Sequence, residues 1–206
     1  LIKKKSYSME GEDLVLLDLT KNIFNGFYVD AGSYHPLHLS NTYLLHKRNW
    51  SGINIDLSKF STDLFDFMRP MDINVNVAVS NIENDIIFYY QKKLSQLTTV
   101  KKNISRERMQ GEIKEKKIKA LRLDTIINKS KFKDRKIDFL NIDLEGADFE
   151  ALQSLNFKIY MPSIICIEIN ETNILKSKTF QYLKNKGYKK IWSSKSKFSH
   201  IFINKN

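Results

Sequence analysis

Short apolar runs alternate along the chain with longer stretches in which apolar residues recur at helical spacing. This alternation is typical of an α/β fold built on a parallel sheet. Strands are predicted at residues 27–29, 52–55, 73–79, 137–142 and 164–169. Helices are predicted at residues 43–48, 59–68, 147–155 and 179–186, the first of them capped by Ser40 or Asn41. A terminal antiparallel pair is expected from residues 188–192 and 200–203.

The middle of the chain departs from this rhythm. Residues 86–90 predict one strand of a local hairpin, and residues 94–97 predict its returning partner. Residues 100–119 form the most polar stretch, for which a mobile loop, an exposed helix or an exposed insertion is expected. A short helix is predicted to start at Leu123. No composition shift marks a boundary, so residues 1–206 are predicted to form a single domain.

Acidic residues stand at the carboxyl ends of four of the predicted strands. They are Asp30, Asp56, Asp143 and Glu168. Ligands of an open parallel sheet bind outside the carboxyl ends of its strands. Carboxylates that converge there repel one another unless a cation or a hydroxyl-rich ligand is shared. The pattern therefore predicts a ligand site at this edge of the sheet.

S-adenosylmethionine suits such a site. Gly32 would let the backbone pass close under the ligand, and Asp56 is placed to accept both ribose hydroxyls. The Gly-x-Gly-x-x-Gly fingerprint of nicotinamide enzymes and the Walker phosphate loop are both absent. Taken alone, the first loop would pass as an ordinary turn. The predicted cofactor-binding residues are Asp30, Ala31, Gly32, Ser33, Asp56, Asn76, Val77 and Ala78.

Four segments together resemble the FkbM-type methyltransferase family. They are Phe27–Pro36, Ser40–Thr42, Trp50–Asp56 and Ile137–Ala147. The resemblance covers most of the chain apart from residues 100–119 and the C-terminal third. It implies a Rossmann-like class I fold with a mostly parallel seven-stranded sheet, helices on both faces and a terminal antiparallel hairpin. It also implies S-adenosylmethionine-dependent O-methylation of a sugar, glycan or natural-product hydroxyl.

The sequence departs from the family pattern at two positions. Met9 stands where the family often has Gln, and Gln96 where it often has Ser or Thr. Neither position belongs to the predicted cofactor site. Both are expected to affect the pocket for the acceptor.

Three residues are candidates for direct chemistry on an acceptor hydroxyl, which benefits from a general base or a metal. Asp143 and Glu145 are the stronger candidates, although Glu145 would also favour the N-terminus of the next helix. His35 is either a base or a residue that only shapes its turn. Asp143, Glu168 and Asn170 offer three oxygen ligands, which predicts a Mg²⁺ site as an alternative use of these strand ends.

The net charge of +11 introduces a competing hypothesis. A nucleic-acid methyltransferase would use the basic segment at residues 100–122 to hold phosphates. A dispersed, lysine-rich surface explains the same charge, because Glu107, Glu112 and Glu115 interrupt the basic runs. A non-enzymatic basic module is a third reading, which the mutually repelling acidic strand ends argue against.

Two features bear on location. The chain has one cysteine, Cys166, in an apolar run, which predicts a buried thiol in a reducing compartment and a cytoplasmic protein. No apolar run is long enough to span a membrane.

Overall fold

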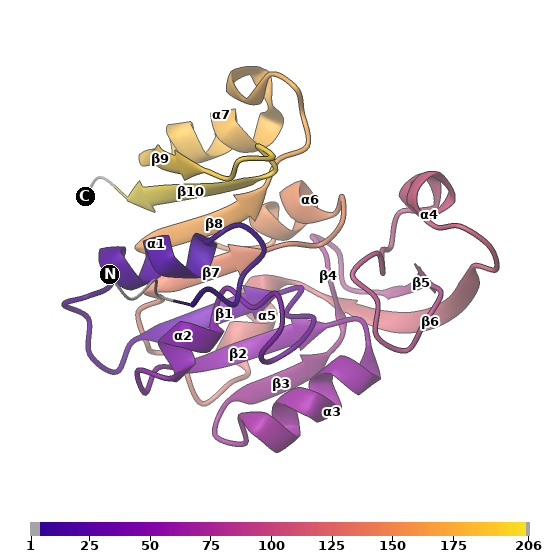
Figure 1. Cartoon of the computed structure of the whole chain (residues 1–206), viewed down its shortest axis with the longest axis horizontal. Helices are drawn as coiled ribbons and strands as arrows, with labels where there is room; N and C mark the ends of the chain where they lie inside the picture. The colour runs from indigo at the N-terminus through magenta and orange to yellow at the C-terminus, as the bar shows by residue number, and fades with distance from the viewer. Residues whose placement is uncertain (1–4, 205–206) are drawn as a thin grey trace.

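The fold is built on a seven-stranded sheet with the order β3-β2-β1-β7-β8-β10-β9 (Figure 1). The computed structural model describes residues 5–204, so the ends of the predicted single domain lie outside it. Five strands are parallel, and β10 runs antiparallel to both β8 and β9. The predicted sheet with its terminal antiparallel hairpin is confirmed. The strands are β1 (Phe27–Ala31), β2 (Ser51–Asp56), β3 (Ile73–Asn76), β7 (Phe139–Ile142), β8 (Ile164–Glu168), β9 (Tyr188–Ser193) and β10 (Ser199–Asn204).

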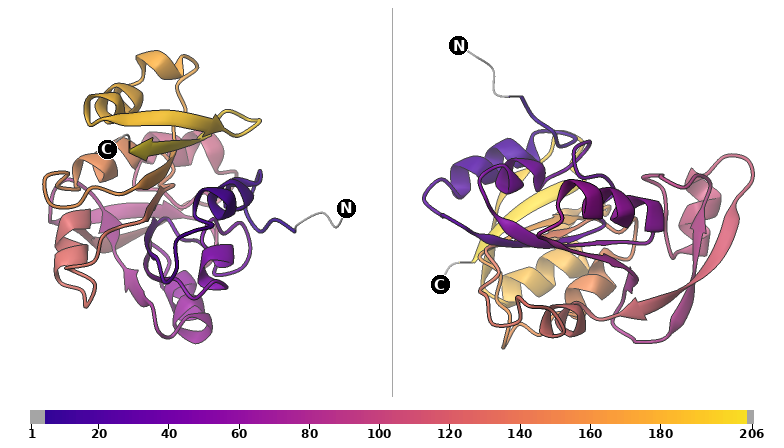
Figure 2. Two further views of the ribbon diagram at one scale, coloured as in Figure 1. Left: turned by 90° about the vertical axis from the view of Figure 1, so that its left-hand side faces the viewer. Right: turned by 90° about the horizontal axis from the view of Figure 1, so that it is seen from below.

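Helices cover both faces of this sheet (Figure 2). One face carries α1 (Glu12–Leu19), α2 (Tyr43–His46) and α3 (Lys59–Met68). The other carries α5 (Leu123–Asn128), α6 (Asp148–Gln153) and α7 (Lys178–Asn185), with a 3₁₀ turn at Ile174–Lys176 before α7. Alternate strand residues feed the two cores: Tyr28 packs with Leu16 of α1, whereas Val29 belongs to the core of Leu152 in α6. None of the helices between residues 5 and 204 is both long and apolar enough to cross a bilayer.

Between β3 and α5 the chain leaves the main sheet and forms a protrusion. It contains β4 (Ala78–Val79), β5 (Asp85–Tyr90), α4 (Lys102–Arg108) and β6 (Lys114–Leu121). We call residues 80–119 the arm, which extends to the right in Figure 1. In its small sheet, β6 lies between β4 and β5, parallel to β4 and antiparallel to β5.

The structure corrects two strand predictions here. The predicted strand at residues 73–79 is two strands, because β3 ends where the Asn76 amide turns to donate to the carbonyls of Asp56 and Leu57. The predicted hairpin partner at residues 94–97 is also wrong, since β5 pairs with β6. Residues 94–97 form no strand, and the return segment contributes only the bridge between Tyr89 and Thr99.

Residues 100–119 are neither one loop nor one helix. They contain α4 and most of β6. The lysines of β6 are exposed and only Ala120 of this strand is buried, so β6 carries no continuous apolar run. Its pairing with β5 across a long intervening segment supplies the stability that the local pattern does not show.

Helix ends and helix α1 show further differences. The residue before α2 is Thr42 rather than Ser40 or Asn41, and no side chain caps this helix. The Thr42 hydroxyl donates to Asp30 instead, at 2.8 Å. Helix α1 has no counterpart among the predicted helices, because its apolar residues are spread around the helix and do not form one face.

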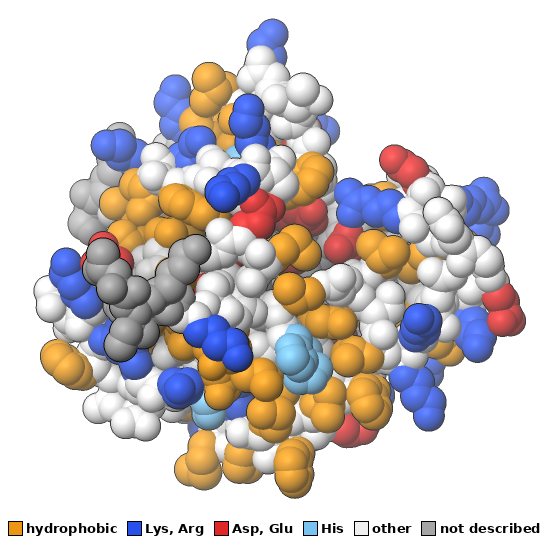
Figure 3. All heavy atoms as spheres, in the orientation of Figure 1, with side chains coloured by type: hydrophobic (Ala, Val, Ile, Leu, Met, Phe, Trp, Pro, Cys, Tyr) orange, Lys and Arg blue, Asp and Glu red, His pale blue; other side chains and the backbone are white. Residues whose placement is uncertain are grey.

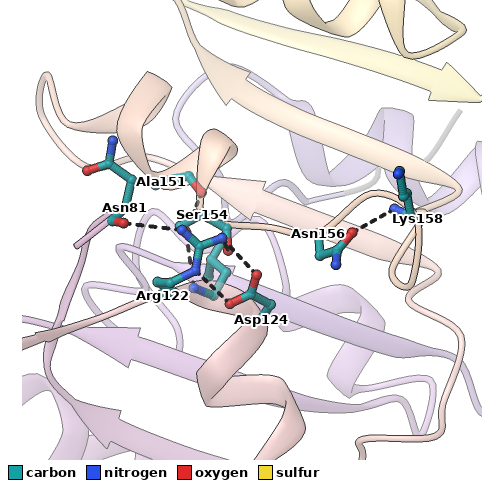
Figure 4. Close-up of polar contacts among 8 residues, drawn as sticks. Asn81, Arg122, Asp124, Ala151, Ser154, Asn156 and Lys158 are labelled. Atoms are coloured by element: carbon teal, nitrogen blue, oxygen red, sulfur yellow. Dashed lines mark hydrogen bonds and ion pairs between the residues drawn. The ribbon is translucent and has the colours of Figure 1, made fainter. Parts of the chain in front are cut away.

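Arg122 anchors the point where the arm rejoins the core (Figure 4). Its guanidinium donates to both carboxylate oxygens of Asp124, at 3.0 and 2.8 Å, a geometry that gives strong pairing. It also donates to the carbonyls of Asn81 and Ser154, at 3.2 and 3.1 Å. One basic residue of the 100–122 segment is thus used to join the arm to α5 and to the end of α6.

Candidate active site

A cavity opens at the carboxyl ends of β1, β2 and β7, where the strand-end acids were expected to meet. Backbone and side chains from the N-terminal segment, the β1 loop, the arm and the loop after β7 line it. The lining residues are Met9, Glu12, Asp30, Gly32, Ser33, Tyr34, Leu39, Asn41, Asp56, Leu57, Ser95, Gln96, Thr98, Asn141, Asp143, Leu144, Glu145 and Ser199. Among these residues there are five carboxylates and no lysine, arginine or histidine.

Gly32 fixes the loop after β1 by close packing, and its predicted role beneath a ligand stays a prediction. Its φ of +86° favours glycine, and a Cβ at this position would lie 1.8 Å from the carbonyl oxygen of Asp143. The amides of Gly32 and Ser33 both donate to the carbonyl of Ile55, at 2.9 and 3.1 Å. Close packing of the β1, β2 and β7 ends therefore demands the glycine, without any ligand.

Asp56 stands at the end of β2 and faces the cavity. Its two carboxylate oxygens accept the backbone amides of Tyr34 and Ser58, at 2.9 and 2.7 Å. Burial raises the pKa of Asp56 to about 6, although both of these hydrogen bonds oppose the shift. Each carboxylate oxygen keeps accepting capacity, because it receives only one of these bonds.

Asp30 is buried, and each of its carboxylate oxygens accepts one hydrogen bond from a side chain of the protein. It accepts the Thr42 hydroxyl at 2.8 Å and the Asn141 amide at 2.9 Å. Burial raises its pKa above the ordinary value. Asp30 therefore holds the surrounding loops together in addition to lining the cavity.

The remaining predicted cofactor residues divide into two groups. Ser33 lines the cavity, whereas Ala31 is a buried residue of β1. Asn76, Val77 and Ala78 lie outside the cavity lining. Their predicted role beside adenine stays a prediction, and the Asn76 amide is occupied by the carbonyls after β2.

A buried arginine organises the loop above Asp30. Arg69, at the end of α3, is 1% exposed. Its guanidinium donates to the hydroxyls of Tyr28 and Thr42, at 2.8 and 2.9 Å, and to the carbonyl of Pro36. Tyr28 in turn donates to Asp72, whose second oxygen accepts the amide of Gly52. The network ties α3, β1, β2 and the loop after β1 together.

An acidic cluster lies on the β7 side of the cavity, and of its three members only Asp143 lines the cavity. Oxygens of Asp143, Asp148 and Glu168 all lie within 4.8 Å of one another. Burial first and the charge of Glu168 second raise the pKa of Asp148 to about 7. Asp143 is open to the cavity, yet removal from bulk water and its acidic neighbours raise its pKa well above the ordinary value.

Glu145 connects this acidic side to the arm. Its carboxylate accepts the Arg108 guanidinium of α4, and its carbonyl accepts the Thr99 hydroxyl at 2.8 Å. Burial and the charge of Glu168 raise the pKa of Glu145 to about 7, although Arg108 opposes the shift. The φ of +48° at Glu145, followed by +94° at Gly146, shows a tight turn immediately beyond the cavity.

His35 lies outside the cavity lining. Its Nδ1 accepts the backbone amides of Leu37 and His38, at 3.0 and 3.1 Å. Burial and the neighbouring His38 lower its pKa. The structure therefore gives His35 a role in shaping its turn, and its role as a base stays a prediction.

The acidic cluster adds one residue, Asp148, to the predicted metal ligands Asp143 and Glu168. Asn170, the third predicted ligand, is exposed two residues after Glu168, and its side chain is hydrogen-bonded to the Glu168 carboxylate. Asp148 accepts the amides of Leu144 and Gly146, at 2.8 and 3.0 Å. Asp148 lies five residues beyond Asp143 and begins α6. It was not predicted because it belongs to a helix and does not stand at the end of a strand.

Several polar residues of the site were not predicted from the sequence. They include Glu12, Asn41 and Asn141 in the lining, and Arg108, which pairs with Glu145. The Asn41 amide donates to Asn141 at 2.9 Å. This hydrogen bond links residues 40–42, one of the segments that resemble the family, to β7. Met9 and Gln96, the two departures from the family pattern, both line the cavity.

The family model for the methyltransferase FkbM domain matches residues 30–190 of the chain. The chain belongs to this family. The resemblance noted in residues 27–36 and 137–147 is thereby confirmed, and with it the methyltransferase class. Comparison with curated proteins and with solved structures returned no match.

Proposed function

We propose that the chain is an S-adenosylmethionine-dependent O-methyltransferase acting on a hydroxyl of a sugar, glycan or related natural product. One observation carries the cofactor half of this proposal. The loop after β1 is bound to the end of β2 through the Gly32, Ser33 and Tyr34 amides, which sets Asp56 on the cavity beside Gly32.

The residues present fit this cofactor. Asp56 keeps lone pairs on both oxygens, as binding of two ribose hydroxyls requires. The cavity lining has carboxylates and no basic side chain, which suits a ligand with a sulfonium charge. S-adenosylmethionine, when bound, supplies a methyl carbon activated by its positive sulfur.

Asp143 and Glu145 are placed to receive the proton of the acceptor hydroxyl. When the acceptor hydroxyl takes up the methyl group that the cofactor would supply, its proton would pass to one of these two carboxylates. Glu145 has a pKa of about 7, close to the value that suits a general base at neutral pH. Asp143 and Glu145 both line the cavity, whereas His35 lies outside its lining.

Calorimetry with S-adenosylmethionine tests the cofactor site. The wild type should release heat, and Asp56→Ala should bind about tenfold more weakly or worse, because a hydrogen bond to a charged group is lost. Asp63→Ala is the matched control, since Asp63 is an exposed acid of α3 paired with Lys59. No heat with the wild type would overturn the cofactor assignment, and undiminished affinity of Asp56→Ala would misplace the ribose site.

The same acidic side offers oxygen ligands to Mg²⁺. Asp143, Asp148 and Glu168 provide the hard carboxylate donors that this ion prefers. Activity measured during titration with EDTA and then Mg²⁺ separates the two uses of the cluster. Loss on chelation with recovery on addition of Mg²⁺ assigns the metal, and unchanged turnover after chelation removes it from the mechanism.

A further inference from the structure

Glu12 is a carboxylate of the cavity that has no role in the proposed cofactor site. It lies in the first turn of α1, is 2% exposed, and lines the cavity from the N-terminal side. One of its oxygens accepts the Glu10 amide at 2.8 Å. The other accepts no hydrogen bond from residues 5–204, so Glu12 keeps accepting capacity at the cavity.

The segment that carries Glu12 is held firmly in place. Asp13, which is 1% exposed, accepts the hydroxyls of Ser6 and Ser8 at 2.7 and 2.8 Å, and the Tyr7 amide at 2.7 Å. The turn before α1 is thus organised around one buried carboxylate. Its neighbour Glu12 is consequently presented to the cavity from a fixed backbone.

Glu12 shares its surroundings with other carboxylates of the cavity. Burial, followed by the charges of Glu12, Asp143 and Asp30, raises the pKa of the Cys166 thiol, which places these carboxylates in one electrostatic environment. Figure 3 shows acidic side chains gathered near the middle of one face of the molecule, with most lysine and arginine side chains farther out. A protein with a net charge of +11 therefore presents an acidic binding cavity.

The carboxylates differ in how far the protein already satisfies them. Asp30 is held by Thr42 and Asn141, and Glu145 by Arg108. Glu12 receives one backbone amide and no basic side chain. An ionised group that is removed from water needs a hydrogen-bond donor or a counter-charge. At Glu12 a bound ligand can supply that donor to the second carboxylate oxygen.

We propose that Glu12 is an acceptor-binding residue that selects a neutral or positively charged hydroxylated acceptor, such as an amino sugar, and excludes anionic ones. A hydroxyl or ammonium group donates to its open oxygen, whereas a phosphate or carboxylate meets five acidic side chains and no basic side chain in the lining. The proposal rests on the proposed function for the identity of the bound molecule as acceptor. The selection by charge is a property of the cavity alone.

Saturation-transfer NMR with four sugars of similar size tests the selection without any cofactor. The probes are methyl glucoside, glucosamine, glucuronate and glucose 6-phosphate. The wild type should bind glucosamine most tightly and methyl glucoside next, with both anionic sugars about tenfold weaker or worse than methyl glucoside, the scale of one charged hydrogen bond. Equal binding of the anionic and neutral sugars, or no binding of any of the four, overturns the proposal.

Glu12→Gln removes the charge and keeps an oxygen that can accept the Glu10 amide, so a merely structural role would leave the ranking unchanged. The variant should lose the preference for glucosamine over methyl glucoside and relax the exclusion of glucuronate. Glu107→Gln, an exposed change of equal charge on α4, should retain the wild-type ranking. An unchanged ranking in Glu12→Gln contradicts the proposal.

Calorimetry separates the possible failures. Normal S-adenosylmethionine binding by Glu12→Gln, together with altered sugar ranking, supports both assignments. A wild type that ranks the sugars as expected but binds no S-adenosylmethionine rejects the proposed function and leaves the charge selection standing.

Discussion

The cavity lining is acidic and the arm is basic, and ion pairs join the two regions. The cavity lining has five carboxylates and no basic side chain, whereas the arm is rich in lysine and arginine. Two arm residues pair with acids beside the cavity, Lys101 with Glu150 and Arg108 with Glu145. Part of the basic charge therefore holds the acidic loop in place. A basic stretch in a sequence does not by itself indicate a nucleic-acid partner.

The most severe test concerns the backbone on which the cavity is built. Gly32→Ala should lower the free energy of unfolding by about 3–4 kcal/mol, because the left-handed φ and the overlap with the Asp143 carbonyl add together. Gly187→Ala is the matched control, with φ of +88° and nothing within 4 Å of the added Cβ. It should cost about 1 kcal/mol by chemical denaturation. Equal losses would contradict the close packing.

Two buried acids, Asp56 in the cavity and Asp148 beside it, should make the fold more stable at low pH. The folded pKa values of Asp56 and Asp148 are about 6 and about 7, above the unfolded value of 3.8. Their protonated forms favour folding, and this contribution is lost as the pH rises through 6 to 7. Denaturation should give roughly 2 kcal/mol less stability at pH 8 than at pH 5, allowing for solvent screening.

Substitution of Asp148 by a neutral residue tests whether this carboxyl group causes the pH dependence of stability. Asp148→Asn should flatten the difference between pH 5 and pH 8, because one of the raised groups is gone. Asp63→Asn, on the exposed surface of α3, should leave it intact. A slope unaffected by Asp148→Asn would show that other groups cause it.

The link between arm and cavity is tested by Arg108→Met. Loss of a half-buried ion pair should cost about 1–2 kcal/mol, more than an exposed pair would. It should also raise the pKa of Glu145, because Arg108 lowers it, and so move the acidic limb of the rate profile to higher pH. Arg106→Met, an exposed change on the same helix, should lie within about 0.5 kcal/mol of wild type.

The smallest effect is expected from salt. Turnover of a sugar acceptor should change less than about twofold between 50 and 200 mM salt, because phosphate contacts are not involved. A nucleic-acid acceptor held by 6–10 phosphate contacts would lose about 10³-fold or more in affinity over the same range. A fall of that steepness would favour the nucleic-acid hypothesis and contradict the role given to the arm.

The central strands of the sheet were predictable because each contains a short, mostly apolar run. Residues 52–55 and 137–142 form short buried runs, each followed by an acid, and the structure places strands at both. The strand ends then indicated Asp56 and Asp143 at one cavity. This part of the site follows from a periodicity that any parallel sheet imposes on its sequence.

The arm and the N-terminal side were not predictable in this way. Strand β6 is exposed on most of its length, and it depends on β5, its partner in three dimensions. Helix α1 lacks a single apolar face, so neither it nor Glu12 gave a periodic pattern. Arg69 resembles a surface residue in sequence, and only the convergence of Tyr28, Thr42 and Pro36 explains its burial.

The arm leaves and rejoins the core at adjacent points, since Ala78 pairs with Ala120 and Val79 with Leu121. Everything between these pairs, including the cavity-lining Ser95, Gln96 and Thr98, is in effect a cassette with two neighbouring ends. Because its two ends meet at one place on the core, a change in the length of this segment would alter the cavity wall formed by Ser95, Gln96 and Thr98, while the strands that precede Gly32 and end at Asp56 would stay in the sheet.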